Sequence, residues 1–141
     1  MTIRSILRSK GADFIFIESG ARLAEAVALL AEKRIGALPV LQSGDVAGIF
    51  SERDVIYCLA QAGQAALQKT VGEVMTAPAV TVEPDCAVLT ALSLMTQRRM
   101  RHLPVIEQGA MIGFVSIGDL VKYRIEKIEA EAEALRDYIR S

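Results

Sequence analysis

The pattern of apolar and polar positions in this chain occurs twice, at an offset of 65 residues. Apolar residues spaced by four and three positions lie on one face of a helix, and this spacing predicts helices over residues 22–34 and 88–100. The apolar positions of the two copies are Leu23, Val27, Leu30, Val88, Leu92 and Met95. A duplicated unit of about 60 residues is therefore the first property of the chain.

Each predicted helix is followed by two short apolar runs that predict a β-hairpin. These runs cover residues 38–41, 46–50, 103–106 and 111–115. A glycine stands in each intervening turn, Gly44 in the first copy and Gly109 in the second, where a hairpin turn needs positive φ. The sequence Leu-Pro-Val opens the first strand of both hairpins.

Weaker signals complete each copy. Short helical turns are expected at residues 2–7 and 70–75, and short strands at 14–17 and 79–82. After the hairpins, further helices are expected from Ser51 to about residue 60 and from Ser116 onward, and residues 61–69 form a polar link.

Each copy thus has the order β-α-β-β-α, and the fold class is α+β. One such unit cannot cover both faces of its sheet, so two units related by a pseudo-twofold axis are expected to fold as one module. We place the first repeat at residues 1–65, the second at 66–125 and a helical extension at 126–141.

The last predicted helix, which begins in the second repeat and continues through the extension, carries an apolar seam with the spacing of a coiled coil. Its positions are Val121, Ile125, Ile128, Ala132, Leu135 and Ile139. The seam spans fewer than three heptads, which leaves two interpretations open. The helix either associates with a second copy or lies back on its own module.

Composition narrows the class of function. The chain has 141 residues, 52% of them hydrophobic and 23% charged, with a net charge of −1, which is typical of a globular protein. The charge balance favours neither nucleic acid nor a membrane surface as partner. No apolar run resembles a signal peptide or a membrane span, and Cys58 and Cys86 fit no metal-binding pattern, so a cytoplasmic location is expected.

The candidate site lies where each hairpin passes into the next helix, at residues 48–54 and 113–119. Both copies contain S-x-x-D, formed by Ser51 and Asp54 and repeated at the second site. One interpretation is purely structural: the serine and the acid form a capping box that satisfies the first amides of the helix.

The other interpretation is a nucleotide site with the same geometry. A helix N-terminus favours a phosphate, and the two oxygens of a carboxylate accept the two hydroxyls of a ribose. Gly48 and Gly113 would let a flat base approach the backbone. Arg53 adds a cation to the first copy, where the second has Gly118, so the two sites are not expected to be equivalent.

The paired units, with their Leu-Pro-Val, two glycines and S-x-x-D, resemble tandem CBS domains, also called a Bateman module. The resemblance covers nearly the whole chain, and the helical tail is similar to that of small stand-alone bacterial CBS-pair proteins. It implies a regulatory module that binds ligands in the clefts between the repeats. The ligands of this family are mostly AMP, ADP or ATP, sometimes S-adenosylmethionine, and in some stand-alone members NAD(H).

The resemblance also assigns roles to residues at matching positions. Asp54 and Asp119 would hold ribose hydroxyls, and Ser51 and Ser116 would contact ribose or phosphate. Arg53 and Arg101 are the phosphate candidates. The residues that would line the base slots are Ile15, Phe16, Ala37, Val80, Thr81 and His102.

We therefore predict a non-catalytic sensor that binds an adenine nucleotide, AMP first and ADP, ATP or NAD(H) as further candidates, and that forms a homodimer. No activated nucleophile, acid–base pair or metal-binding cluster stands out, so neither an enzyme nor a metal requirement is expected. The alternative is an interaction protein that oligomerises through its C-terminal helix without a nucleotide. No nucleic acid or membrane partner is expected, and the regulated target is not indicated.

Overall fold

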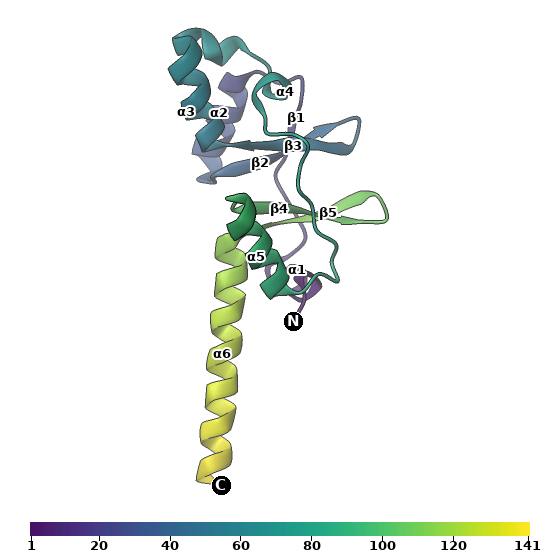
Figure 1. Cartoon of the computed structure of the whole chain (residues 1–141), viewed down its shortest axis with the longest axis vertical. Helices are drawn as coiled ribbons and strands as arrows, with labels where there is room; N and C mark the ends of the chain where they lie inside the picture. The colour runs from purple at the N-terminus through teal and green to yellow at the C-terminus, as the bar shows by residue number, and fades with distance from the viewer.

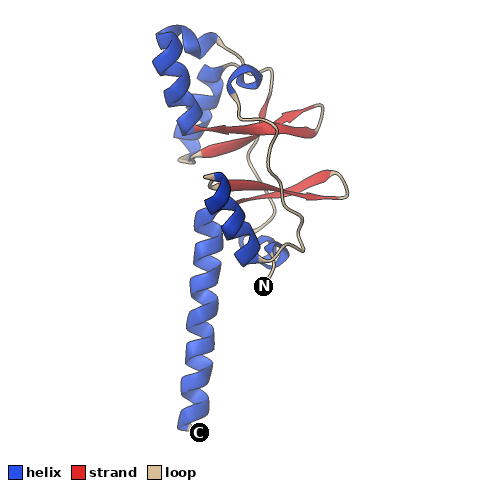
Figure 2. Ribbon diagram, viewed as in Figure 1, coloured by secondary structure: helices blue, strands red, loops and turns tan.

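The computed structural model describes residues 1–141 and contains the two repeats as two similar α+β units (Figures 1 and 2). The elements of the first part are α1 (Ile3–Lys10), β1 (Ile17–Glu18), α2 (Leu23–Lys33), β2 (Ala37–Gln42), β3 (Asp45–Ser51), α3 (Glu52–Ala62) and the 3₁₀ segment η1 (Gly63–Gln68). Those of the second part are α4 (Val71–Val74), α5 (Val88–Arg98), β4 (His102–Glu107), β5 (Ala110–Ser116) and α6 (Ile117–Arg140). The predicted fold class, with its pseudo-twofold relation and long final helix, is confirmed.

The two hairpins have the same register. Leu38 pairs with Phe50 in β2–β3, and Leu103 pairs with Val115 in β4–β5. Each turn contains two residues with positive φ, Ser43 and Gly44 in the first copy and Gln108 and Gly109 in the second. This is the conformation of a two-residue turn whose twist matches that of the strands, and it confirms the role predicted for the glycines.

The strands predicted at residues 14–17 and 79–82 are much shorter than expected. In the first copy, only Ile17 and Glu18 pair, parallel to Val40 and Leu41 of β2. In the second copy, pairing is reduced to one bridge between Val82 and Val105. Most of both segments is extended chain that belongs to no sheet.

The two hydrophobic cores explain this result because each takes a helix from the other repeat. The core of the second unit includes Ile3, Ile6 and Leu7 of α1, and the core of the first unit includes Val71 of α4. The segments that follow these two short helices must cross from one unit to the other, and they cannot pair along their length with either sheet. Figure 1 shows both crossings as long connections beside the stacked hairpins.

Helix α6 begins in the second unit and then leaves it. Leu120 is fully buried in the core of that unit, and Tyr123 packs against the same core. Beyond this point, the helix projects away from the module with no other element beside it (Figure 1). The interpretation in which the extension lies back on its own module is therefore wrong. None of the helices, α6 included, combines the length and the apolar composition that crossing a membrane requires.

Candidate functional site

Two clefts lie between the repeats, one beside each S-x-x-D motif. The Asp119 cleft has a volume of about 610 Å³ and is lined by Lys10, Asp13, Phe14, Ile15, Arg34, Ile35, Gly36, Ala37, His102, Phe114, Ser116 and Asp119. The Asp54 cleft has a volume of about 1140 Å³. The residues that line it include Ser51, Glu52, Arg53, Asp54, Thr76, Val80, Arg98, Arg99, Arg101 and His102. Small-molecule pockets in proteins measure roughly 300–1,000 Å³, so both have room for a ligand.

The repeat symmetry relates the two clefts. Residues 13–15 in the Asp119 cleft correspond to residues 78–80 in the Asp54 cleft, and Phe114 corresponds to Ile49. Residues 34–37 and His102 line both clefts, so this segment and this side chain form the wall between them. The clefts are thus two versions of one site, and their differences come from substitutions within the repeat.

Both S-x-x-D motifs form capping boxes. In the second copy, the Ser116 amide donates to Asp119 Oδ2 at 2.8 Å, and the Asp119 amide donates to Ser116 Oγ at 3.1 Å. In the first copy, the Ser51 amide donates to Asp54 Oδ2 at 2.8 Å, with a longer return bond of 3.4 Å. The structural role is therefore present, and a cleft lies beside each box as well.

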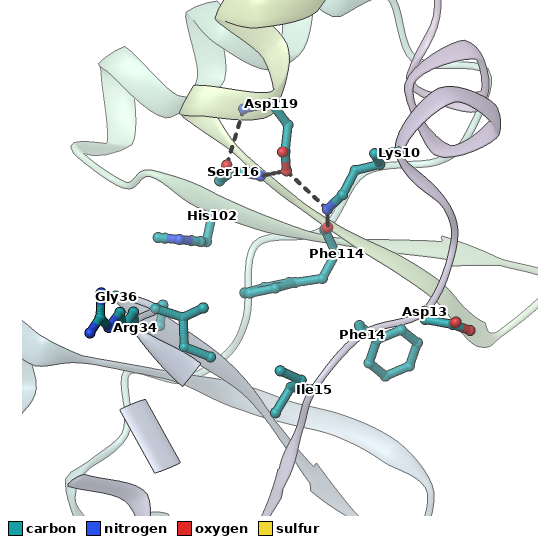
Figure 3. A pocket seen from close by; sticks show the side chains of 12 residues that line it. Lys10, Asp13, Phe14, Ile15, Arg34, Gly36, His102, Phe114, Ser116 and Asp119 are labelled. Atoms are coloured by element: carbon teal, nitrogen blue, oxygen red, sulfur yellow. Dashed lines mark hydrogen bonds and ion pairs between the residues drawn. The ribbon is translucent and has the colours of Figure 1, made fainter. Parts of the chain in front are cut away.

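Capping leaves the two carboxylates with different free atoms. Oδ2 of Asp119 also accepts from Lys10 Nζ at 3.0 Å, whereas its Oδ1 makes no hydrogen bond within the chain (Figure 3). Both oxygens of Asp54 have partners, because Thr76 Oγ1 donates to Oδ1 at 3.2 Å. Asp119 therefore offers a ligand an oxygen with no partner, whereas the equivalent oxygen of Asp54 already accepts one hydrogen bond and has one acceptor position left.

Asp119 is ionised at neutral pH. Its partial burial acts to raise the pKa of the carboxyl group, but the hydrogen bonds from the Ser116 amide and from Lys10 together outweigh this effect. The pKa of Asp119 consequently lies below its ordinary value. A carboxylate in this state accepts hydrogen bonds only, which suits hydroxyl donors.

The amides at the two helix N-termini are largely occupied. The first amide of α6, from Ile117, donates to the carbonyl of Arg101 at 2.8 Å, and the first amide of α3, from Glu52, donates to the carbonyl of Gly36 at 3.0 Å. The third amide in each helix donates to the capping serine. Phosphate binding at these termini would thus depend mainly on side-chain cations.

Three aromatic rings line the Asp119 cleft, and two of them are stacked. The imidazole of His102 stacks on the ring of Phe114, with centroids 5.4 Å apart and an angle of 18° between the planes. Figure 3 shows these rings on one side of the cleft and Ile15 and Gly36 on the other. Burial lowers the pKa of His102, and the carboxylates of Asp119 and Glu52 counteract this only in part, so the ring is neutral at pH 7.

The balance of charge differs strongly between the clefts. Arginine side chains dominate the Asp54 cleft, at positions 34, 53, 98, 99 and 101, where the carboxylates are those of Glu52 and Asp54. The Asp119 cleft has Lys10 and Arg34 against two carboxylates. Arg34 and Arg99 are equivalent residues, and both end their helices in the left-handed conformation. The Asp54 cleft is therefore the one suited to a ligand with several negative charges.

Gly48 and Gly113 do not have the role that the sequence suggested. A Cβ atom on Gly48 would lie 2.6 Å from the carbonyl oxygen of Thr76, and one on Gly113 would lie 2.6 Å from Cδ2 of Leu7. Neither glycine lines a cleft. These positions accommodate the chain's own packing, and the proposed close approach of a base to them is wrong.

Most of the predicted site residues line the clefts. Ile15, Ala37, His102, Ser116 and Asp119 line the Asp119 cleft, and Ser51, Arg53, Asp54, Val80, Arg101, Ala37 and His102 line the other. Phe16 and Thr81 line neither. Phe16 is 45% exposed and contacts Phe14 edge to face. Neighbouring side chains in an extended segment point in opposite directions. Ile15 and Val80 therefore line the clefts, and the next residue in each segment points away.

Lys10, Phe114 and Thr76 also line the clefts, and they are not among the predicted site residues. No local pattern indicated Lys10, because it reaches the Asp119 cleft only through the packing of α1 against the second unit. Phe114 lies within the second motif segment, at residues 113–119, and its position there could have suggested it. Thr76 lies 22 residues after Asp54 and corresponds to Gly11 of the first repeat, so no sequence signal indicated it. No three His, Cys, Asp or Glu side chains come together in a position that could hold a metal ion.

Comparisons with known proteins agree with this architecture. The model of the CBS domain family matches residues 3–61 and 71–126. The mitochondrial CBS domain-containing protein CBSX3 of Arabidopsis thaliana is 35% identical over 147 residues, which cover 98% of this chain and 71% of that protein. A CBS-domain containing protein from Agrobacterium tumefaciens has a solved structure with a TM-score of 0.84 and 36% identity, covering 87% of this chain and 92% of that one.

A third similar structure contains ligands. The CBS domain pair of protein MJ0100 was solved in complex with 5′-methylthioadenosine and S-adenosyl-L-methionine. It is 25% identical to this chain with a TM-score of 0.78, and the match covers 90% of this chain and 98% of that one. Because the family model matches both repeats and most of the chain, this protein belongs to the CBS-domain family, as a tandem pair.

Proposed function

We propose that this chain is a regulatory, non-catalytic module that binds an adenine nucleotide in the clefts between its repeats and works as a homodimer. AMP is the first candidate, followed by ADP, ATP and NAD(H). The adenosine-containing ligands of the MJ0100 pair support the choice of ligand class. A cytoplasmic location, carried over from the sequence, is part of the same proposal.

The observation that carries the proposal is the open Oδ1 of Asp119. This oxygen belongs to an ionised carboxylate, borders a cleft of about 610 Å³ and has no partner within the chain. The capping box holds the carboxylate in place through Oδ2, which accepts from the Ser116 amide. A ribose hydroxyl donating to Oδ1 would satisfy an acceptor that the fold has already oriented, and the ordering of that side chain would cost little further entropy.

The base and the phosphate have plausible places in the same clefts. In the Asp119 cleft, the apolar side chains of Ile15 and Phe114 border the space in which a base would lie (Figure 3). In the Asp54 cleft, the equivalent residue Val80 would contact the base. Arg53 and Arg101 remain the proposed phosphate contacts, now with Arg98 and Arg99 beside them in the Asp54 cleft. A polyphosphate would therefore prefer the Asp54 cleft, and a ligand of low charge would prefer the Asp119 cleft.

A thermal-shift panel of AMP, ATP, NAD⁺, NADH and S-adenosylmethionine tests the proposal. A ligand that binds only the folded chain stabilises it by about 2.7 kcal/mol at a hundredfold excess over Kd. We expect at least one adenine ligand to raise the melting temperature. No shift with any ligand at millimolar concentration would contradict the proposal.

Matched variants assign the ligand to a cleft. Asp119→Asn and Asp54→Asn each keep an oxygen that can accept the capping bond from the serine amide, but they remove a carboxylate acceptor from one cleft. The change that matters is the ligand-induced shift, because both variants can lower the melting temperature of the free protein slightly. Loss of the shift in only one variant identifies the occupied cleft, and an unchanged shift in both would contradict ribose binding by these residues.

A second function is favoured by the exposed apolar seam on α6. The alternative is an interaction protein in which the repeats only fold and the helix recruits a second copy. Removing residues 126–141 separates the two functions, because this deletion leaves both clefts intact. If oligomers disappear and no nucleotide ever binds the full chain, the alternative is correct.

A further inference from the structure

We propose that α6 pairs with α6 of a second copy as a parallel two-stranded coiled coil, and that its flanking charges select the parallel orientation. The proposal deepens the homodimer part of the proposed function and does not depend on which nucleotide binds. Its basis is the placement of the apolar seam relative to the module and the order of charges beside that seam.

The apolar seam faces away from the module. Its large side chains, those of Val121, Ile125, Ile128, Leu135 and Ile139, are between 42% and 72% exposed. The opposite face of the helix makes the contacts with the module, through the packed ring of Tyr123. The module thus orients the seam outward, where a partner helix can reach it along the projecting part of α6 (Figure 1).

The seam fills the a and d positions of the heptad pattern of a coiled coil. With Val121, Ile128 and Leu135 at the d positions, the a positions are Ile125, Ala132 and Ile139. β-branched residues at a with leucine at d favour two strands, whereas β-branched residues at both a and d favour three or four. Leu135 follows the first pattern, and Val121 and Ile128 follow the second, so the sedimentation experiment below also measures the number of strands. Tyr123 then falls at an f position, on the side opposite the seam, which agrees with its contact to the module.

The flanking charges complement one another in the parallel orientation. In a parallel coil, a g residue meets the e residue five positions later on the partner helix. Arg124 at g therefore faces Glu129 at e of the second copy, and Glu131 at g faces Arg136 at e. The twofold axis of the dimer repeats each of these two pairs once more. The coil therefore has four such contacts, and each joins opposite charges.

The antiparallel orientation would bring like charges together. In an antiparallel coil, the a residues of one helix pack against the d residues of the other. The flanking g residues then meet g residues of the partner, and e residues meet e residues. Glu131 would then face Glu131 of the second copy, Glu129 would face Glu129, and Lys122 would face Arg136. All of these contacts are repulsive, so the pattern of charge distinguishes the two orientations.

Charge reversal on the full chain tests the pairing. Arg124 and Glu129 form no ion pair within the chain, which makes them the cleaner of the two pairs. Arg124→Glu or Glu129→Arg alone should raise the dimer Kd about tenfold in sedimentation experiments, since each places like charges together twice. The double variant should restore the original Kd. Within one helix these residues are five positions apart and do not face each other, so restoration requires a second copy.

Cysteine cross-linking tests the orientation. In a parallel coil, an a residue lies beside the same residue of the second copy, so Ile139→Cys should form a disulfide between residues 139 of two chains upon mild oxidation. Asp137→Cys, at an f position on the opposite face, is the matched control and should not cross-link. Tryptic peptides identify the bond and exclude the native cysteines.

The outcomes separate this inference from the proposed function. A protein that is monomeric at all concentrations would overturn both the coil and the homodimer, without affecting the nucleotide shifts. A dimer that ignores both single charge reversals, or that fails to join residues 139, would overturn the parallel coil alone. Tenfold weakening by each single variant, recovery in the double variant and a 139–139 bond would together support it.

Discussion

Lys10 Nζ lies 3.0 Å from Oδ2 of Asp119, and the same nitrogen donates to the carbonyl of Phe114 at 2.8 Å. Lys10 ends the first helix of the chain, whereas Asp119 begins the last, and the exchange of α1 between the two cores brings them together. At the equivalent place in the other cleft, Asp54 accepts from the hydroxyl of Thr76. The carboxylate of Asp119 thus has a cation beside it, whereas the carboxylate of Asp54 has a neutral hydrogen-bond donor.

Replacing Lys10 with methionine should raise the pKa of Asp119 toward its ordinary value, because the largest remaining effects are burial and the Ser116 amide. A lowered carboxyl pKa stabilises the fold above the unfolded value of about 3.9, and this stability is lost as the pH falls through the folded pKa. Both groups are partly exposed, so the loss at neutral pH should be at most about 1 kcal/mol. A carboxyl NMR titration measures the pKa.

Lys33→Met is the control for this experiment. Lys33 ends α2 and forms no ion pair in the structure, so its replacement should leave the titration of Asp119 unchanged. If Lys10→Met also leaves that titration unchanged, the contact between Lys10 and Asp119 has no electrostatic effect in solution.

His102 should make stability depend on pH just below neutrality. Burial lowers its pKa in the folded chain, with Asp119 and Glu52 opposing and Arg101 and Lys10 adding to the effect. Below the unfolded value of about 6.5, the unfolded chain binds a proton that the folded chain does not, so stability should fall as the pH decreases from 6.5 toward the folded pKa. Urea unfolding between pH 5.5 and 7.5 measures this slope.

His102→Phe serves as the comparison, since it retains an aromatic ring against Phe114 and cannot titrate. The chain has one histidine, so the variant should show a flatter stability profile in this range. An equal slope in both proteins would mean that His102 titrates normally in the fold. Absolute stability is not the relevant quantity here, because the phenylalanine changes packing as well.

Much of the architecture was predictable because the determinants are local and repeated. The spacing of apolar residues fixed α2 and α5, and the glycines at positions 44 and 109 marked turns that do require positive φ. The capping boxes at Ser51 and Ser116 located the starts of α3 and α6. Each of these signals concerns residues within a few positions of one another, which is the range over which a sequence pattern is informative.

The exchange of α1 and α4 between the cores was not predictable from such patterns. Ile3 and Val71 are apolar helix residues in any arrangement, and nothing in their neighbourhood indicates which core they join. The short pairing of β1 and the position of Lys10 both follow from that exchange. The sequence therefore predicted the carboxylates of the candidate site but not the groups that the crossing segments bring to them.

Gly48 and Gly113 should respond differently to alanine, although they occupy equivalent positions. A methyl group at residue 48 would meet the carbonyl of Thr76, which is held in place because Ile49 and Thr76 exchange two backbone hydrogen bonds of 2.9 Å. At residue 113 the obstacle is the end of the Leu7 side chain, which can rotate. We expect Gly48→Ala to lower the free energy of unfolding by about 1–3 kcal/mol and Gly113→Ala by less. Equal losses in urea unfolding would contradict this difference.

Ala132→Ile should strengthen the dimer if α6 forms the parallel coil. Ala132 is the smallest residue of the seam and occupies an a position, where a β-branched side chain fills the space between two parallel helices. Ala130→Ile is the matched control, because residue 130 lies at an f position and suffers the same loss of helix propensity, up to about 0.7 kcal/mol, without reaching the partner. Sedimentation should therefore show a lower dimer Kd for Ala132→Ile than for Ala130→Ile. Equal constants for the two variants would mean that residue 132 does not face a second helix.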